Sequence, residues 1–286
     1  VADWNDQGRV FDAVRLSLRR AAVELDAFYA KTGEKQAFQK DAAGKVLRGA
    51  PEDADLAVLH ARLTRFAAFR PSLTAVYDRV GARRQHRVTA GLFLDGAPLK
   101  GLTYSAEFYY QAGRQRPQTT EEEIGAFFGA VGLGYTAAVR MSPSLSLWYE
   151  HVSGDDDKKD GTTRTFDTLF ATNHKFYGFM DLFLNLPADT GGLGLQDLGG
   201  RLALEPLRGV TLWLDFHHFE PAKRDPVYGT TTLGNELDLL LRWKINAYLT
   251  TEGVYGVFFP KLGISNLRGG GKDTEHFGYV QLDLRI

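Results

Sequence analysis

Residues 196–217, QDLGGRLALEPLRGVTLWLDFH, form two runs of alternating apolar and polar side chains joined by a short turn at 205–208. In the first run Leu198, Leu202 and Leu204 share one parity, and Asp197 and Arg201 share the other. Successive side chains of a β-strand point to opposite faces. The segment therefore predicts two antiparallel strands, each with one apolar and one polar face.

The same alternation recurs along the whole chain, with clear examples at 14–19, 87–95 and 280–286. The composition agrees, because 31 Gly, 12 Tyr and 19 Phe against 2 Met favour strands and turns over helices. The connections alternate in length. Short turns lie at 20–21, 96–100, 141–144, 205–208 and 245–247, and long polar loops lie at 33–53, 114–122, 154–175, 221–233 and 260–274.

Each run alone also suits a half-buried strand of a soluble sheet. Short turns at one end and long loops at the other are instead typical of a transmembrane β-barrel, which also carries aromatic girdles. Aromatic side chains fall on the apolar parity near strand ends at Tyr29, Tyr77, Tyr104, Phe108, Tyr110, Tyr149, Trp243 and Tyr255. We predict an all-β fold, an antiparallel transmembrane barrel of about thirteen or fourteen strands with short periplasmic turns and long extracellular loops.

Composition excludes several classes of function. A net charge of −1 gives no long-range positive electrostatic field that would attract nucleic acid. The absence of cysteine excludes disulfides and thiolate metal sites. No apolar stretch is long enough for a transmembrane helix. Residues 1–5 show no signal peptide. If the C-terminus is periplasmic, counting strand directions back along the chain would place its start outside the cell. Export does not normally permit this, so we expect an odd number of strands before Val1.

The same parity singles out residues 154–194. The strand at 145–153 ascends and the strand at 195–205 descends, so everything between them belongs to one excursion. Its central part, ATNHKFYGFMDLF at 171–183, mixes charged and aromatic side chains. Such a loop is expected to fold against the inner wall and narrow the pore. We expect His174, Lys175, Tyr177 and Asp181 to form the constriction.

Several segments resemble the alginate export family of Gram-negative outer-membrane barrels. They are FDAVRLSLRRAAVELDAFYAKT (11–32), GDDD with FDTLFATNHKFYGFMDLF (154–183), GLQDLGGRLALEP (194–206), LDFHHFE (214–220), LGNELDLLLRW (233–243) and HFGYVQLDLRI (276–286). The resemblance implies a monomeric barrel of about eighteen strands, of which about five would precede Val1. It also implies passage of an anionic polysaccharide in the best-known member, a porin-like role in many others, and no catalytic residues.

Energetics assign the arginines to the lumen, because an arginine facing lipid at mid-bilayer costs about 2–4 kcal/mol. The pore-lining candidates are Arg15, Arg62, Arg87, Arg201 and Arg242. Such a ladder would attract anions. The same face carries at least as many acids, so a lattice of salt bridges that holds the strands in register is an equally compatible interpretation. Those acids are Glu24, Asp26, Asp78, Asp95, Glu107, Glu150, Asp197, Glu205, Asp215, Glu236, Asp238, Glu252 and Asp283.

Three further motifs favour structure over chemistry. The acidic run 154–162 lacks the alternating ligands and closing glutamate of a calcium loop, so it is interpreted as a solvated tip. His217 and His218 face opposite sides of a strand and cannot chelate one ion. The glycine-rich run 129–134 has no following helix to bind a nucleotide. We expect no enzyme activity, cofactor or metal.

The sequence thus predicts a single outer-membrane barrel domain over 1–286, a porin-like channel for a hydrophilic solute or an anionic polysaccharide. Its expected partners are outer-membrane lipid and lipopolysaccharide, the cargo, and periplasmic or envelope proteins. The alternative is a structural barrel that anchors a larger envelope complex without transport. A soluble β-sandwich binding module is disfavoured by the aromatic girdles.

Overall fold

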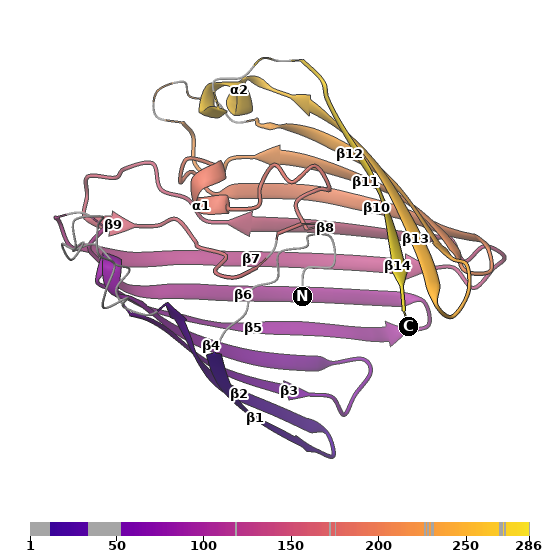
Figure 1. Ribbon diagram of the computed structural model, residues 1–286, viewed down its shortest axis with the longest axis horizontal. Helices are drawn as coiled ribbons and strands as arrows, with labels where there is room; N and C mark the ends of the chain where they lie inside the picture. The colour runs from indigo at the N-terminus through magenta and orange to yellow at the C-terminus, as the bar shows by residue number, and fades with distance from the viewer. Residues whose placement is uncertain are drawn as a thin grey trace, which may run out of the picture.

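The computed structural model describes residues 12–33, 53–117, 119–171, 173–174, 176–225, 227, 229, 232–268, 271 and 273–285. Strands dominate it (Figure 1). They are β1 (Asp12–Arg20), β2 (Val23–Gly33), β3 (Ala54–Leu63), β4 (Arg70–Val80), β5 (Gln85–Leu99), β6 (Leu102–Gln115), β7 (Glu122–Thr136), β8 (Ser144–Val152), β9 (Thr162–Thr163), β10 (Leu195–Leu207), β11 (Val210–Glu220), β12 (Gly234–Lys244), β13 (Leu249–Pro260) and β14 (Glu275–Leu284).

The strands form one curved antiparallel sheet in which each strand pairs with its neighbours in the chain, from β1 to β14. The two-residue strand β9 lies off this path and pairs in parallel with β7. Three short helices complete the described elements: η1 (Gly81–Arg83), α1 (Leu186–Asp189) and α2 (Leu262–Arg268). The predicted all-β antiparallel architecture is confirmed. In the described part of the chain, β1 and β14 each have one neighbour in the sheet.

The connections alternate as the sequence indicates. The turn after β1 occupies two residues, as does the one after β5, whereas the segment between β8 and β10 covers 153–194. One connection departs from the rule, because β4 and β5 are joined at the long-loop end by only the helix η1 and Arg84. The predicted loop at 33–53 lies largely outside the described residues.

The two faces of the sheet are buried in the opposite sense to those of a soluble protein. Apolar side chains such as Leu16, Leu198 and Val280 are 72%, 56% and 77% exposed. Polar side chains of the other parity are buried, among them Asp197, Asp215 and Glu236. Water would penalise so large an exposed apolar surface, so this face requires an apolar surrounding. Among the described residues, no helix is long and apolar enough to cross a membrane.

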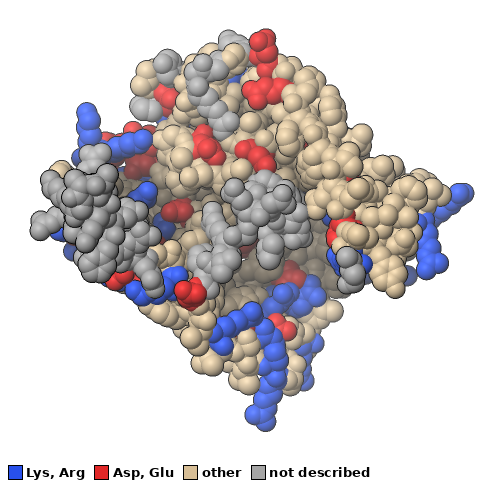
Figure 2. Space-filling model, in the orientation of Figure 1, with Lys and Arg blue, Asp and Glu red and all other residues tan. Residues whose placement is uncertain are grey.

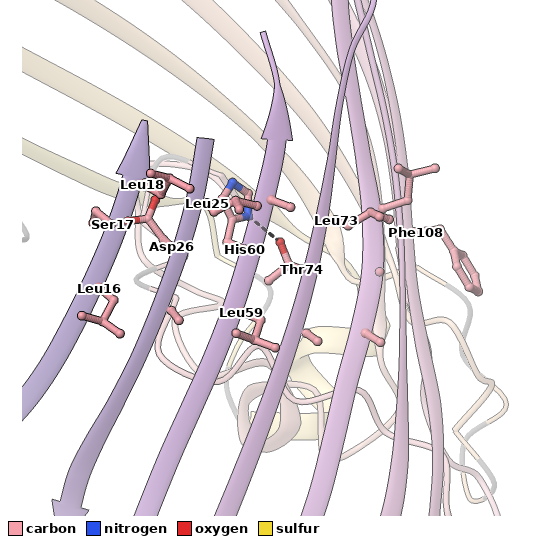
Figure 3. Close-up of a pocket in the computed structure, with 16 residues that line it drawn as sticks. Leu16, Ser17, Leu18, Leu25, Asp26, Leu59, His60, Leu73, Thr74 and Phe108 are labelled. Carbon is pink, nitrogen blue, oxygen red and sulfur yellow. Dashed lines mark hydrogen bonds between the residues drawn. The ribbon is translucent and has the colours of Figure 1, made fainter. Parts of the chain in front are cut away.

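An apolar hollow of about 980 Å³ crosses β1 to β6 (Figure 3). Its floor contains the small side chains of Ala27, Ala61, Ala75 and Ala90, which share the apolar parity. Larger apolar side chains form its walls: Leu16, Leu18, Leu25, Leu59, Leu73, Leu92 and Phe108. The polar parity faces the other side, where His60 hydrogen-bonds Thr74. The hollow therefore arises where alanines replace large side chains on the apolar face.

Candidate pore constriction and lining

The excursion, residues 153–194, leaves and rejoins the sheet at one point because β8 and β10 are directly paired. The backbone N–H of Asp155 donates to the Gly192 carbonyl at 2.8 Å across this neck. Two glycines permit the close approach. A Cβ on Gly154 would lie 1.9 Å from the Leu193 carbonyl oxygen, and one on Gly194 would lie 2.3 Å from that of Val152. The neck therefore holds both ends of the excursion together.

One side of the excursion binds the polar face of β5 and β6. Arg87 on β5 forms ion pairs with Asp78 at 2.8 Å and with Asp167 of the excursion at 2.9 Å. Gln111 on β6 makes two hydrogen bonds to the backbone of Asp167, at 2.8 and 3.0 Å. Both wall residues are buried. Residue 167 is thus fixed by side chains from two adjacent strands.

The tip of the excursion, residues 178–180, binds the polar face of β12. The backbone N–H of Met180 donates to Glu236 at 2.9 Å, and that of Phe179 donates to Asp238 at 3.4 Å. Gly178 has φ of +82°, and a Cβ there would lie 2.2 Å from the Glu236 carboxylate. Gly256 on β13 gives similar room, since its Cβ would lie 2.6 Å from Asp238. The two glycines therefore let the backbone at residues 178–180 and the strand β13 approach these carboxylates closely.

Apolar contacts complete the attachment. Phe179 is buried against Leu240 and Val254, and Phe183 lies 4.7 Å from the ring of Phe219. In the sheet, β6 and β12 are separated by β7, β8, β10 and β11. A segment that binds both must cross the hollow of the curved sheet, where Figure 1 shows it together with α1.

Three of the four predicted constriction residues lie among these contacts. His174 and Asp181 bind each other through Nδ1 and Oδ1 at 2.5 Å, within the excursion. Tyr177 is buried and hydrogen-bonds Glu150 on β8. Burial and the Glu150 carboxylate raise the pKa of the Tyr177 hydroxyl well above its ordinary value, so it remains a donor. Lys175 lies outside the described residues.

Asn173 organises the excursion from within. Its side-chain amide donates to the Thr168 hydroxyl at 3.0 Å and to the Leu184 carbonyl at 2.8 Å. Its own carbonyl accepts from the N–H of Phe176 and from that of Tyr177. The backbone of Asn173 has φ of +57°, in the left-handed region that asparagine tolerates better than most residues. The sequence reasoning did not select this residue.

Every arginine that the sequence places in the lumen has an acidic partner. Arg201 and Arg242 also lie over the Trp213 ring, with their Cζ atoms 5.0 and 5.3 Å from its centroid. The partners are Asp26 for Arg15, Asp95 for Arg62, Asp78 and Asp167 for Arg87, Asp215 for Arg201 and Glu252 for Arg242. Most of these pairs join adjacent strands, which is the lattice that the sequence analysis describes.

The Arg87 pair should matter most for stability, because it is the most buried of the set. Arg87→Met leaves Asp78 and Asp167 without their guanidinium, and we expect a loss of about 3 kcal/mol in the free energy of unfolding. Arg15→Met, whose side chain is 62% exposed, should have little effect. Urea unfolding in detergent, followed by tryptophan fluorescence, measures both. Equal destabilisation by the two variants would contradict this ranking.

Charged side chains are unevenly distributed on the face shown in Figure 2, which has the orientation of Figure 1. Acidic side chains appear over the middle of the face, whereas the most prominent basic groups lie toward its periphery. The buried acids of the wall include Asp197, Glu236 and Asp238. Of these, Asp197 accepts from Trp148 at 2.8 Å and binds His217 at 2.9 Å. His218 faces the other side and binds Asn235, as parity requires.

The acidic run 154–162 is organised by its own hydrogen bonds. Asp155, Asp157 and Asp160 each accept a backbone N–H two residues further along. Asp160 also pairs with Arg164 at 2.6 Å. Within the described ranges no group of three or more His, Asp or Glu side chains is arranged to hold a metal ion.

Sequence reasoning missed the residues that receive the excursion, although the sequence carries a signal for them. Leu240, Val254, Phe219 and Phe258 are apolar side chains on the polar parity of β11 to β13. They are buried against the excursion. A strand that is apolar on both parities is covered on both faces. Interrupted alternation therefore marks where an inward-folded segment packs.

Comparison with known proteins agrees with this architecture. OccAB1 of Acinetobacter baumannii matches with a TM-score of 0.57 at 12% identity, over 96% of this chain and 67% of that one. A variant of OccD1 (OprD) matches with a TM-score of 0.55 at 14% identity, over 94% and 68%. OpdO of Pseudomonas aeruginosa matches with a TM-score of 0.53 at 13% identity, over 95% and 69%. The chain spans about two thirds of these proteins, and no curated protein is similar to it in sequence.

The curved antiparallel sheet, with an apolar outer face and a polar inner face, has the fold of the outer-membrane β-barrel class. The family model for alginate export matches residues 1–263. The chain belongs to the alginate export family of Gram-negative outer-membrane proteins. The resemblance read from the sequence is confirmed, and both the family and the similar structures are transport proteins and not enzymes.

Proposed function

We propose that the chain forms the wall of a channel for small hydrophilic solutes and that the excursion 153–194 narrows it. One observation carries this proposal. The excursion is bound to β5 and β6 through Asp167 and to β12 through residues 179 and 180, so it crosses the lumen instead of extending into solvent. We further propose that additional strands close the wall, to about eighteen in all.

The paired arginines support a solute over an anionic polysaccharide. An arginine attracts a passing anion when its charge is uncompensated. Arg15, Arg62, Arg87, Arg201 and Arg242 each have a carboxylate within 3.0 Å, so these five described residues do not form a ladder of uncompensated guanidinium groups. The alternative role, a structural anchor without transport, has no support from the family or from the similar structures.

The apolar outer face supports contact with the membrane. Its alanine-floored hollow at β1 to β6 would be filled by the hydrocarbon chains of outer-membrane lipid or lipopolysaccharide, as any lipid-facing surface is. Nothing in the hollow selects a particular headgroup.

The full chain inserted in a planar bilayer tests the proposal. We expect discrete conductance steps with weak selectivity between small cations and anions, because the inner arginines are neutralised by acids. Vesicles that contain the protein should swell in monosaccharides and much less in oligosaccharides. A chain that inserts and folds but carries no current would contradict a channel. Strong anion selectivity with passage of a polyuronate would favour the polysaccharide instead.

A further inference from the structure

A cavity of about 320 Å³ lies between the excursion and the polar face of β4 to β8. Its wall side includes Thr89, Glu107 and Glu150, and its excursion side includes Phe166 and Tyr177. Asp167 and Tyr177, which attach the excursion to the wall, also line this cavity. The cavity would lie beside the constriction, on the route of any solute that passes it.

The two glutamates are placed on one rung of the sheet. Glu107 on β6 is paired with Ala130 on β7, and Ala130 is paired with Glu150 on β8. Two strand spacings therefore separate their backbones, about 10 Å. The small side chain of Ala130 leaves the space between the carboxylates open. The geometry suits one group held between two acids.

Neither carboxylate is neutralised in the described part of the chain. Ion pairs within 4.0 Å are formed by many acids of this face, but neither Glu107 nor Glu150 has a described basic partner, and no described lysine or arginine lines the cavity. Arg87, whose partner Asp167 lines the cavity, is paired with Asp78 and Asp167. Glu150 accepts one hydrogen bond, from Tyr177. Both side chains are half-buried, and partial loss of water makes a carboxylate without a cation costly, a cost that a bound cation offsets.

A third polar group points to a ligand. Thr89 lines the cavity, is 4% exposed, and its hydroxyl oxygen has no hydrogen-bond partner among the described atoms. It occupies the polar parity of β5 opposite Gln111, four residues along β6 from Glu107, so it lines the other end of the cavity. Buried hydroxyls are normally satisfied, so this one indicates a group that is bound from inside the cavity.

Aromatic rings provide the rest of the lining. Tyr109 and Phe128 lie on the wall, 6.3 Å apart between ring centroids, and Phe166 lies 5.8 Å from Phe128. Aromatic faces attract cations and also contact apolar stems. Carboxylates combined with aromatic rings therefore recognise a cationic group on an apolar carrier, and they disfavour an anion.

We propose that this cavity is a binding site for an organic cation, an ammonium or guanidinium group on a short apolar stem. Glu107 and Glu150 bind the cationic group and the rings contact the stem, while Thr89, at the other end of the cavity, accepts from a donor at the far end of a longer ligand. The site refines the proposed channel by naming the class of solute that pauses beside the constriction.

Calorimetric titration of the detergent-solubilised full chain tests the site without requiring any current. The probes are benzylammonium and agmatine, with benzyl alcohol and benzoate as neutral and anionic counterparts. We expect saturable binding of both cations and none of the two counterparts. Glu107→Gln and Glu150→Gln should each weaken binding about tenfold or more, since a charge-assisted hydrogen bond is lost. Thr89→Val should weaken the binding of agmatine, which carries a donor at each end, by a smaller factor and should leave that of benzylammonium unchanged.

Glu123→Gln is the matched control, because it removes the same charge from a side chain that is 70% exposed at the end of β7. It should bind both cations as the unaltered chain does. Retained resistance of each variant to SDS without heating shows that it is folded. Equal binding of benzoate, or cation binding that survives both glutamate substitutions in folded variants, would overturn the site. Conductance without binding would leave the channel standing and remove only the cation site.

Discussion

Replacement of residues 166–183 by a short glycine–serine linker is expected to raise the single-channel conductance several-fold. These residues carry the contacts of the excursion with β5, β6 and β12, including Asp167, Tyr177 and Met180. Without them the described contacts of the excursion with β5, β6 and β12 are lost, and the resistance of a pore is dominated by its narrowest part. Planar-bilayer recording of the refolded variant measures the change.

The matched control replaces 156–160 by glycine and serine at equal length. These residues belong to the acidic run 154–162. Their described contacts lie within the excursion or with Lys223, which is outside the strands. Conductance of this variant should equal that of the unaltered chain. An excursion variant that is folded yet conducts no more than the unaltered chain would show that the segment does not obstruct the pore.

Gly178→Ala should release the tip of the excursion while leaving its length unchanged. Its Cβ would lie 2.2 to 2.5 Å from all three atoms of the Glu236 carboxylate group, and the residue has φ of +82°. Either the Glu236 side chain or the tip must shift, and either movement disrupts the hydrogen bonds from residues 179 and 180 to Asp238 and Glu236. We expect higher mean conductance with frequent transitions between levels.

Gly161→Ala separates this clash from backbone strain. Gly161 lies in the same excursion with φ of +78°, and a Cβ there would meet nothing within 4 Å. It therefore has the same unfavourable backbone conformation for alanine but no collision with the wall. Current traces of Gly161→Ala should match those of the unaltered chain. If both variants behave alike, the effect arises from strain in the excursion and not from its attachment to β12.

The strands and their two faces could be predicted from the residues alone, because both follow from local rules. Alternation along 196–217 is realised as β10 and β11, with Leu198 and Leu202 outward and Asp197 and Arg201 inward. The cost of an arginine in lipid then fixes which face is polar. The alternation of short turns and long loops could also be predicted from the residues. The exception is the connection between β4 and β5, which is short although it lies at the end of the sheet that carries the long loops.

The site could be predicted only in part. Parity showed that 154–194 cannot be a spanning segment, and the mixture of charge and aromatic rings indicated an inward fold. Neither pattern could show that His174 binds Asp181 inside the excursion, or that Tyr177 binds Glu150. Those partners are seven and twenty-seven residues apart, and no period of a strand relates them. Interrupted alternation at Leu240 and Val254 was the one local sign of where the tip packs.

The sequence by itself determined the sheet, its faces and the existence of one long excursion. The alternation of side chains along a strand and the cost of a charged side chain in lipid apply to each residue independently of its distant neighbours. Tertiary structure alone decided what the lumen contains. The pairing of each arginine with an acid, the fit of Gly178 against Glu236 and the rung shared by Glu107 and Glu150 depend on strand register. Register is a property of neighbouring strands, so the character of the pore emerges only when they are assembled.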